Sequence, residues 1–144
     1  MHVGIDVSSV KRFENWYQYS DASLKKIFTN SEVTKYRSIK NKFFACQFLA
    51  SRFAVKEASF KALSGYCDVE KLAVPKFLAT CRLVSIEKTV SGVPKLCLNF
   101  DSTHELFARL ETSVSISHER CHSAAVVLLL NAKLISPTTS LQVF

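Results

Sequence analysis

Residues 43 to 63 contain neither glycine nor proline, and their large apolar side chains recur at the spacing of an α-helix. Leu49, Phe53 and Phe60 fall within one broad face of such a helix, and Leu63 continues it. The Ser64-Gly65 pair that follows predicts the end of the helix. A helix of this length with a broad apolar face needs a second layer of structure to cover that face, so the core must form around it.

The amino terminus is expected to supply a strand of that second layer. Val3, Ile5 and Val7 alternate with Gly4 and Asp6, which is the period of a strand with one buried face. The three apolar residues are expected to face the core, and Asp6 is expected to point away from it.

Two shorter helices are expected between this strand and the long helix. Ser8 and Ser9 can cap a helix that begins near Val10. Thr29 and Glu32 stand at the spacing of a capping box, which predicts the start of a second short helix.

The second half of the chain has mainly the pattern of strands joined in hairpins. A turn-rich tetrapeptide, Ser-Gly-Val-Pro at residues 91 to 94, separates the first two strands. The predicted elements are strands at 81–89 and 95–100, a short helix at 102–110, and a second hairpin with strands at 113–117 and 124–130.

This order of elements predicts an α+β fold, with a small antiparallel sheet packed against one long and several short helices. The chain has 144 residues, of which 48% are hydrophobic, and this suits one core rather than two. We therefore expect a single domain over residues 1 to 130. The tail, residues 131 to 144, is expected to be loosely ordered.

The sequence predicts a cytoplasmic protein with reduced thiols. Its start lacks the basic and apolar segments of a secretory signal, and its longest strongly apolar run, residues 124 to 130, is far shorter than the roughly 20 residues that span a bilayer. The five cysteines are odd in number and include no C-x-x-C pair. They are expected to be mostly core thiols rather than zinc ligands.

The positive charge lies mainly in the first half of the chain. Residues 1 to 61 carry 11 Lys and Arg against 5 Asp and Glu, whereas residues 62 to 144 carry 8 against 7. Such a field attracts polyanions, but charge alone does not choose among nucleic acid, a membrane surface, an acidic protein and a phosphorylated cofactor.

The long helix carries a polar cluster made of Arg52, Lys56, Glu57 and Lys61. Helical spacing aims Glu57 toward the packed side, where a carboxylate needs a cation. One interpretation is an ordinary surface pair between Glu57 and Lys61, which are four residues apart.

The other interpretation is a divalent metal shared by Glu57 and a second carboxylate, for which Asp6 is the obvious candidate. Magnesium takes one or two protein carboxylates together with phosphate oxygens and water. Lys56, Lys61 and Arg52 would then hold phosphate oxygens.

A third polar segment, residues 113 to 118, has three serines at alternate positions and ends in His118. A strand with this pattern is often the solvated side of a sheet, and a histidine at a turn is often incidental. His118 and His122 have the spacing of a metal pair on a helix, but their context is a turn, so we do not interpret them as ligands.

Three segments taken together resemble the holo-acyl-carrier-protein synthase family, the small group of 4′-phosphopantetheinyl transferases. They are GIDVSSVKRF at 4–13, FLASRFAVKEASFKAL at 48–63 and SVSISHERCHSAAVVLL at 113–129. Residues 28 to 36 resemble the second helix of the family, and Ser-Gly-Val-Pro at 91–94 resembles its Gly-Lys-Pro turn. The resemblance covers about residues 3 to 130.

This resemblance implies a fold of the phosphopantetheinyl transferase type and a role for particular residues. Asp6 and Glu57 would coordinate Mg²⁺ beside the diphosphate of coenzyme A. Lys61 would neutralise phosphate charge, and His118 would lie near the same diphosphate. The remaining residues expected to contact the cofactor are Lys56, Gly92, Pro94 and Ser117.

The resemblance also implies partners and a reaction. Arg12, Arg52 and Phe53 would face an acidic acyl carrier protein, whose serine attacks the β-phosphate of coenzyme A with release of adenosine 3′,5′-bisphosphate. Either a metal-bound water or Glu57 could accept the serine proton. A homotrimer with sites shared between subunits, a role in fatty acid biosynthesis, and no binding of membrane or nucleic acid are implied as well.

Three departures from the family pattern lie around the expected nucleotide. Ser9 stands where many relatives carry Glu, Val93 replaces the Lys of Gly-Lys-Pro, and Ser64-Gly65-Tyr66 replaces a Gly-Thr-Gly-like turn. Two other functions stay open, a basic nucleic-acid-binding domain and an inactive family member that only binds coenzyme A or carrier protein.

Overall fold

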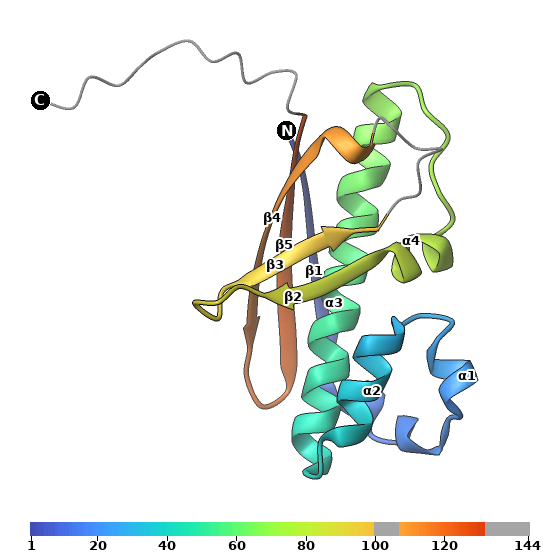
Figure 1. Ribbon diagram of the computed structural model, residues 1–144, viewed down its shortest axis with the longest axis vertical. Coiled ribbons are helices and arrows are strands. Elements are labelled where there is room, and N and C mark those ends of the chain that lie inside the picture. Colours follow the sequence, from blue (N-terminus) through green and yellow to red (C-terminus); the bar gives the residue numbers. More distant parts are fainter. Residues whose placement is uncertain (100–106, 132–144) are drawn as a thin grey trace, which may run out of the picture.

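The computed structural model describes residues 1–99 and 107–131, and it confirms the α+β fold (Figure 1). Its main sheet has three antiparallel strands in the order β1-β5-β4, and β2 and β3 form a separate hairpin. The strands are β1 (His2–Ser9), β2 (Val84–Lys88), β3 (Pro94–Leu98), β4 (Leu110–His118) and β5 (His122–Asn131). The helices are α1 (Asp21–Leu24), α2 (Asn30–Ser38), α3 (Lys42–Val69) and α4 (Phe77–Leu83), with short 3-10 helices η1 (Val10–Phe13), η2 (Trp16–Gln18) and η4 (Phe107–Arg109).

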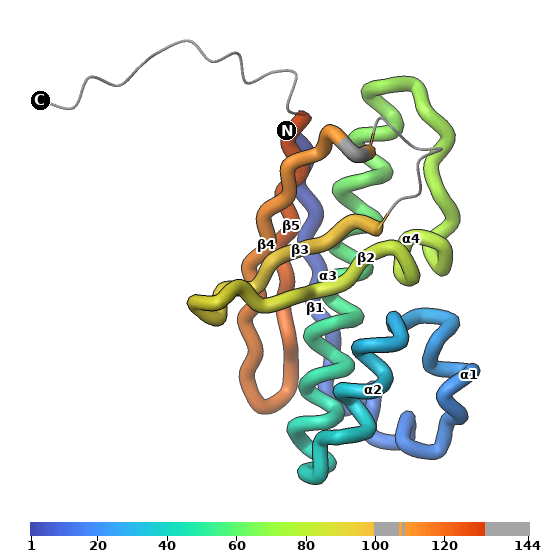
Figure 2. Tube along the Cα trace, viewed as in Figure 1, coloured from blue at the N-terminus to red at the C-terminus, as the bar shows by residue number. Residues whose placement is uncertain are grey.

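The long helix α3 runs beside the main sheet, and the β2–β3 hairpin crosses in front of both (Figure 1). A core forms between α3, the sheet and the hairpin, and a second core lies where α3 meets the first helices. Figure 2 shows that the first strand and the last described strand run next to each other, in agreement with their pairing from His2 with Leu129 to Ser9 with His122.

Helix α3 continues past the predicted stop at Ser64-Gly65 and ends at Val69. Tyr66 and Cys67 are both buried, so the apolar face continues for another turn. The turn that ends the helix contains Lys71, whose φ of 56° is left-handed. Burial of the next turn therefore outweighs the helix-breaking preference of one glycine.

Strand β1 has the opposite orientation to the one predicted. Val3, Ile5 and Val7 are 54%, 59% and 60% exposed, whereas Gly4 faces α3 and is buried. A Cβ atom on Gly4 would lie 1.8 Å from the carbonyl oxygen of Ala58, so only a strand face of small residues lets the helix approach this closely. Asp6 shares that inner face, and the expectation that it points away from the core is wrong.

The predicted helix starts have different outcomes. Thr29 and Glu32 form the predicted capping box of α2. The segment after β1 is only a single 3-10 turn, and the Ser9 side chain makes no capping hydrogen bond to it. Sequence therefore predicted the cap of the longer helix and overestimated the shorter one.

Both predicted hairpins are present, with shifted boundaries. Cys81 to Leu83 end α4 instead of starting β2. The hydroxyl of Thr112 on β4 donates to the carbonyl of Leu96 on β3 (3.0 Å), which joins the hairpin to the main sheet. Of the helix predicted at 102–110, residues 102 to 106 lie outside the described residues, and so does the tail beyond Asn131.

All five thiols are free; Cys46, Cys67 and Cys81 are buried, whereas Cys121 is exposed. Within residues 1–99 and 107–131, no helix combines the length and the apolar character that a membrane crossing requires.

Candidate active site

Two carboxylates from distant parts of the chain meet where β1 packs on α3. Asp6 comes from the inner face of β1, and its side chain is only 10% exposed because α3 covers it. Glu57 comes from the middle of α3. Burial raises the pKa of the Glu57 carboxyl, and hydrogen-bonding contact with Asp6 and its negative charge raise that pKa further. The two acids predicted to meet are therefore brought together.

Two cations lie beside this acid pair. The ammonium of Lys61 donates to Asp6 Oδ1 at 2.9 Å and to the carbonyl of Ile5 at 3.0 Å. The charges of Lys61 and Arg12 lower the pKa of Glu57, which partly offsets the effect of Asp6. Among the described residues no ion pair includes Glu57, so the simple Glu57–Lys61 surface pair is not what forms.

The donor set of this pair suits a hard divalent cation. Carboxylate oxygens are the ligands that Mg²⁺ prefers, and two of them leave room for phosphate oxygens and water. A divalent ion would relieve the repulsion that raises the pKa of Glu57. No group of three or more His, Cys, Asp or Glu residues gathers within the described part of the chain, which is the pattern a metal held by protein alone would need.

Lys56 was expected to contact the cofactor, but its ammonium is an internal structural group. The side chain is 1% exposed, and its nitrogen lies 2.9 Å from Glu32 Oε2. It also donates to the carbonyls of Cys81 (2.7 Å) and Val84 (2.6 Å). Three acceptors satisfy the three N–H donors of an ammonium, so none is left for phosphate. The ion pair instead ties α2, α3 and the α4–β2 junction together.

Phe53 was expected to contact a partner directly, but it is 2% exposed. Its ring packs against Phe13 and Phe77, with centroids 5.8 and 6.1 Å away. The guanidinium of Arg12 lies over this ring, 4.3 Å from its centroid. The ring therefore supports Arg12, which is exposed, and does not itself reach the surface.

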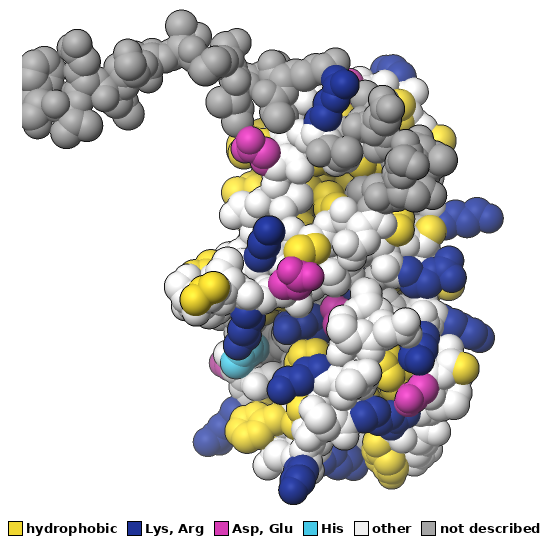
Figure 3. Space-filling view, viewed as in Figure 1, with side chains coloured by type: hydrophobic (Ala, Val, Ile, Leu, Met, Phe, Trp, Pro, Cys, Tyr) yellow, Lys and Arg dark blue, Asp and Glu magenta, His cyan; other side chains and the backbone are white. Residues whose placement is uncertain are grey.

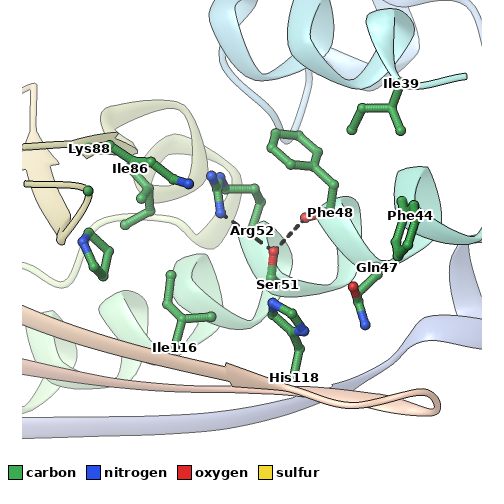
Figure 4. A pocket seen from close by; sticks show the side chains of 12 residues that line it. Ile39, Phe44, Gln47, Phe48, Ser51, Arg52, Ile86, Lys88, Ile116 and His118 are labelled. Atoms are coloured by element: carbon green, nitrogen blue, oxygen red, sulfur yellow. Dashed lines mark hydrogen bonds between the residues drawn. The ribbon is translucent and has the colours of Figure 1, made fainter. Parts of the chain in front are cut away.

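A pocket of about 370 Å³ lies between α3, the β2–β3 hairpin and the end of β4 (Figure 4). Of the residues predicted to contact the cofactor, Gly92, Pro94 and His118 line it. The other lining side chains include Arg52, which was expected to face a carrier protein, and Lys88. We call this cavity the hairpin pocket.

Ser117 does not belong to the hairpin pocket. Alternate residues of β4 point to opposite faces, and Ile116 and His118 take the pocket side. Ser117, Ser115 and Ser113 are exposed on the outer face of the sheet, as the alternating pattern suggested. The expected contact of Ser117 with the same cofactor therefore does not form within one chain.

The acid pair and the hairpin pocket lie on different sides of α3. Phe48, which lines the pocket, and Glu57 are nine residues apart in the helix, and at about 100° per residue this is half a turn of rotation. Asp6, Glu57 and Lys61 are absent from the pocket wall. A single chain thus holds two halves of the predicted site without joining them.

Two residues near these sites were not predicted from the sequence. Glu32 was interpreted only as a capping residue, although its carboxylate also pairs with Lys56. Lys88 was not considered, because it falls in a short strand without a motif. Its position next to the predicted 91–94 turn was the only available signal.

Dark-blue Lys and Arg side chains are concentrated on the lower part of the molecule, around the first helices (Figure 3). The exposed cations of this region, which we call the basic surface, are Lys11, Arg12, Lys25, Lys26, Lys35, Arg37, Lys40 and Lys42. The charge asymmetry of the sequence therefore becomes a localised surface.

Comparison with known proteins gives consistent matches over most of the chain. Residues 2–126 match the model of the 4′-phosphopantetheinyl transferase superfamily. The holo-[acyl-carrier-protein] synthase of Caldicellulosiruptor saccharolyticus is 32% identical over 88% of this chain and 94% of its own. That of Chlamydia trachomatis serovar D is 34% identical over 88% and 96%.

Solved structures agree with these matches. The crystal structure of the Helicobacter pylori holo-[acyl-carrier-protein] synthase in complex with coenzyme A has a TM-score of 0.62 and 26% identity, covering 89% of this chain and 99% of that one. Its similarity extends over the strand, the long helix and the hairpins that hold the acid pair and the hairpin pocket. The chain therefore belongs to the 4′-phosphopantetheinyl transferase superfamily, within its holo-[acyl-carrier-protein] synthase family.

Proposed function

We propose that this protein transfers the 4′-phosphopantetheine group of coenzyme A to a serine of an apo-acyl carrier protein. The observation that carries the proposal is the meeting of Asp6 and Glu57, with Lys61 and Arg12 beside them, in a chain of this family. The expected products are holo-acyl carrier protein and adenosine 3′,5′-bisphosphate. The expected setting is the cytoplasm, in support of fatty acid biosynthesis.

Asp6 and Glu57 would hold a Mg²⁺ ion, which when bound supplies positive charge to the phosphate oxygens and the leaving group. Lys61 is already fixed 2.9 Å from Asp6, so its ammonium can add to that stabilisation without a large movement. The serine oxygen forms a bond to the β-phosphorus while the bond to the bridging oxygen breaks. The serine proton passes to water or to Glu57, whose raised pKa makes it a better base than an ordinary glutamate.

The basic surface supports an acidic partner. It is made of side chains from the first helices and surrounds Arg12, which lies next to the acid pair through its stacking on Phe53 and its effect on Glu57. Charges of this kind steer an oppositely charged protein into place and fix its orientation. An acidic carrier protein docked here would present its serine beside Asp6 and Glu57.

The outer face of the main sheet supports a homotrimer. Val3, Ile5 and Val7 are exposed there, next to the half-buried Val126 and Leu128 of the paired strand β5. An apolar sheet face of this kind is typical of a subunit interface. Assembly would also let the hairpin pocket of one subunit approach the acid pair of another, which one chain keeps apart.

The direct test is to incubate the purified chain with apo-acyl carrier protein, coenzyme A and Mg²⁺ and to weigh the carrier by mass spectrometry. We expect the mass of the carrier to rise by one phosphopantetheine group on its serine. An unchanged carrier mass, with the chain folded and coenzyme A bound, would instead support the inactive binding protein considered from the sequence.

A further inference from the structure

The hairpin pocket has a one-sided charge. Arg52, Lys88 and His118 line it, and no described residue in its wall carries a carboxylate. The remaining wall is neutral, with Ile86 and Ile116 among its apolar side chains. A cavity that gathers cations without acids is built for an anion.

The nearest buried acid does not neutralise Arg52. Glu32 Oε1 lies 4.0 Å from Nε of Arg52, whereas Oε2 lies 2.9 Å from the ammonium of Lys56. One carboxylate therefore faces two cations. The Nε atom of Arg52 is buried and has no hydrogen-bond partner among the described residues. The guanidinium is thus held at the pocket with part of its charge and one donor unsatisfied.

Lys88 is aimed at the same space from the other side. It ends β2, opposite Pro94, and Figure 4 shows its ammonium pointing toward the guanidinium of Arg52. The neighbouring acid, Glu87, pairs in register with Lys95, and alternation along β2 places it on the other face of the strand. Two like charges that converge without an acid between them lack an anionic partner.

We propose that Arg52 and Lys88 bind the 3′-phosphate of coenzyme A, an inference that rests on the proposed function. A phosphate monoester carries close to two negative charges at neutral pH, and cations alone can hold it. The acid pair repels phosphate unless a metal is present, so the diphosphate belongs there and the monoester belongs in a pocket without acids. Val93 gives the 91–94 turn no cation of its own, and Lys88 supplies one from the adjacent strand.

Steady-state transfer with coenzyme A and with 3′-dephospho-coenzyme A tests this assignment. Lys88→Ala is expected to raise KM for coenzyme A about tenfold, since charged hydrogen bonds have strengths of this order. KM for 3′-dephospho-coenzyme A and kcat are expected to stay at wild-type values. Lys95→Ala, in the opposite strand of the same hairpin, is the matched control and should behave as wild type. Lys88→Arg should restore most of the affinity.

A binding measurement without metal separates this inference from the proposed function. By titration calorimetry in EDTA, wild type should bind adenosine 3′,5′-bisphosphate more tightly than adenosine 5′-monophosphate, and Lys88→Ala should remove most of that difference. Absence of transfer by wild type would defeat the proposed function and leave this result to be judged separately. Equal effects of Lys88→Ala on both coenzymes, or equal binding of the bisphosphate by wild type and Lys88→Ala, would overturn the inference.

Discussion

At the scale of single residues, the sequence predicted the chemistry of the site better than its geometry. Asp6 and Glu57 were singled out as acids that can share a metal, and they do lie together. Lys56 was misassigned because helical spacing gives the direction of a side chain but not the depth of its surroundings. Its three acceptors come from α2, α4 and β2, segments whose approach no local pattern specifies.

The raised pKa of Glu57 predicts how stability depends on pH. An acid whose pKa is raised on folding binds its proton more tightly in the native state, so it favours folding below the unfolded pKa of about 4.3. That contribution is lost as pH rises through the folded pKa. In metal-free buffer, Glu57→Gln should therefore raise Tm relative to wild type at pH 8, and the difference should shrink toward pH 4.

Differential scanning calorimetry with and without Mg²⁺ checks the same residue. Wild type should gain Tm with Mg²⁺, because a ligand at about 100 times its Kd contributes about 2.7 kcal/mol. Glu57→Gln should show a much smaller gain. An identical Mg²⁺ response in the two proteins would remove Glu57 from the metal site.

Arg12 provides a second residue-scale prediction. Arg12→Glu reverses a charge of the basic surface, so KM for the carrier protein should rise about tenfold or more at low salt, while KM for coenzyme A changes less. The effect should weaken as salt increases, because screening acts on exposed charges. Lys95→Glu, a charge reversal on the hairpin, serves as the control. Equal losses for both substrates would contradict the assignment of Arg12 to the partner.

At the scale of elements, the long helix and both hairpins follow from the sequence, and the strand β1 does not. Apolar alternation predicted that Val3, Ile5 and Val7 face inward. The side that α3 covers is instead chosen by close approach at Gly4, together with the burial of Ser8. Periodicity identifies the two faces of a strand, but in a chain that also exposes an apolar face it does not say which one the helix covers.

Two glycines test this account of the β1–α3 contact with opposite expected signs. Gly4→Ala should destabilise the protein by about 3 kcal/mol or more, because the added Cβ would collide with the backbone of Ala58. Gly65→Ala meets nothing closer than 3.5 Å and should stabilise helix α3 by up to about 1 kcal/mol. Urea denaturation of both variants measures the two changes. A mild effect of Gly4→Ala would show that β1 and α3 are less tightly packed.

At the scale of the whole molecule, the sequence predicted an α+β domain and the structure has one. It could not show that Asp6 and His118 lie on different sides of α3 in one chain, because that separation depends on how the hairpins cross the helix. The proposed trimer follows from this separation and from the exposed apolar face of the sheet.

Mixing two defective variants tests whether sites are shared between subunits. Glu57→Gln damages the acid pair and His118→Ala damages the pocket, so each alone should be nearly inactive. If each site combines the acid pair of one subunit with the pocket of its neighbour, co-expressed variants should regain on the order of a quarter of wild-type activity through random assembly. Light scattering should give the mass of a trimer for both variants and for wild type. No recovery in a mixed trimer would place each site within one chain.

The dependence of transfer on metal and on Asp6 tests the central claim most directly. The rate at which a carrier protein gains phosphopantetheine should be measured against Mg²⁺ concentration for wild type and for Asp6→Asn, with circular dichroism as the control for folding. We predict that wild type is inactive in EDTA and regains full activity with Mg²⁺, and that Asp6→Asn folds but stays at least 100-fold slower, which corresponds to about 2.7 kcal/mol of lost transition-state stabilisation. Undiminished transfer in EDTA, or a wild-type rate from Asp6→Asn, would contradict a metal site built from Asp6 and Glu57.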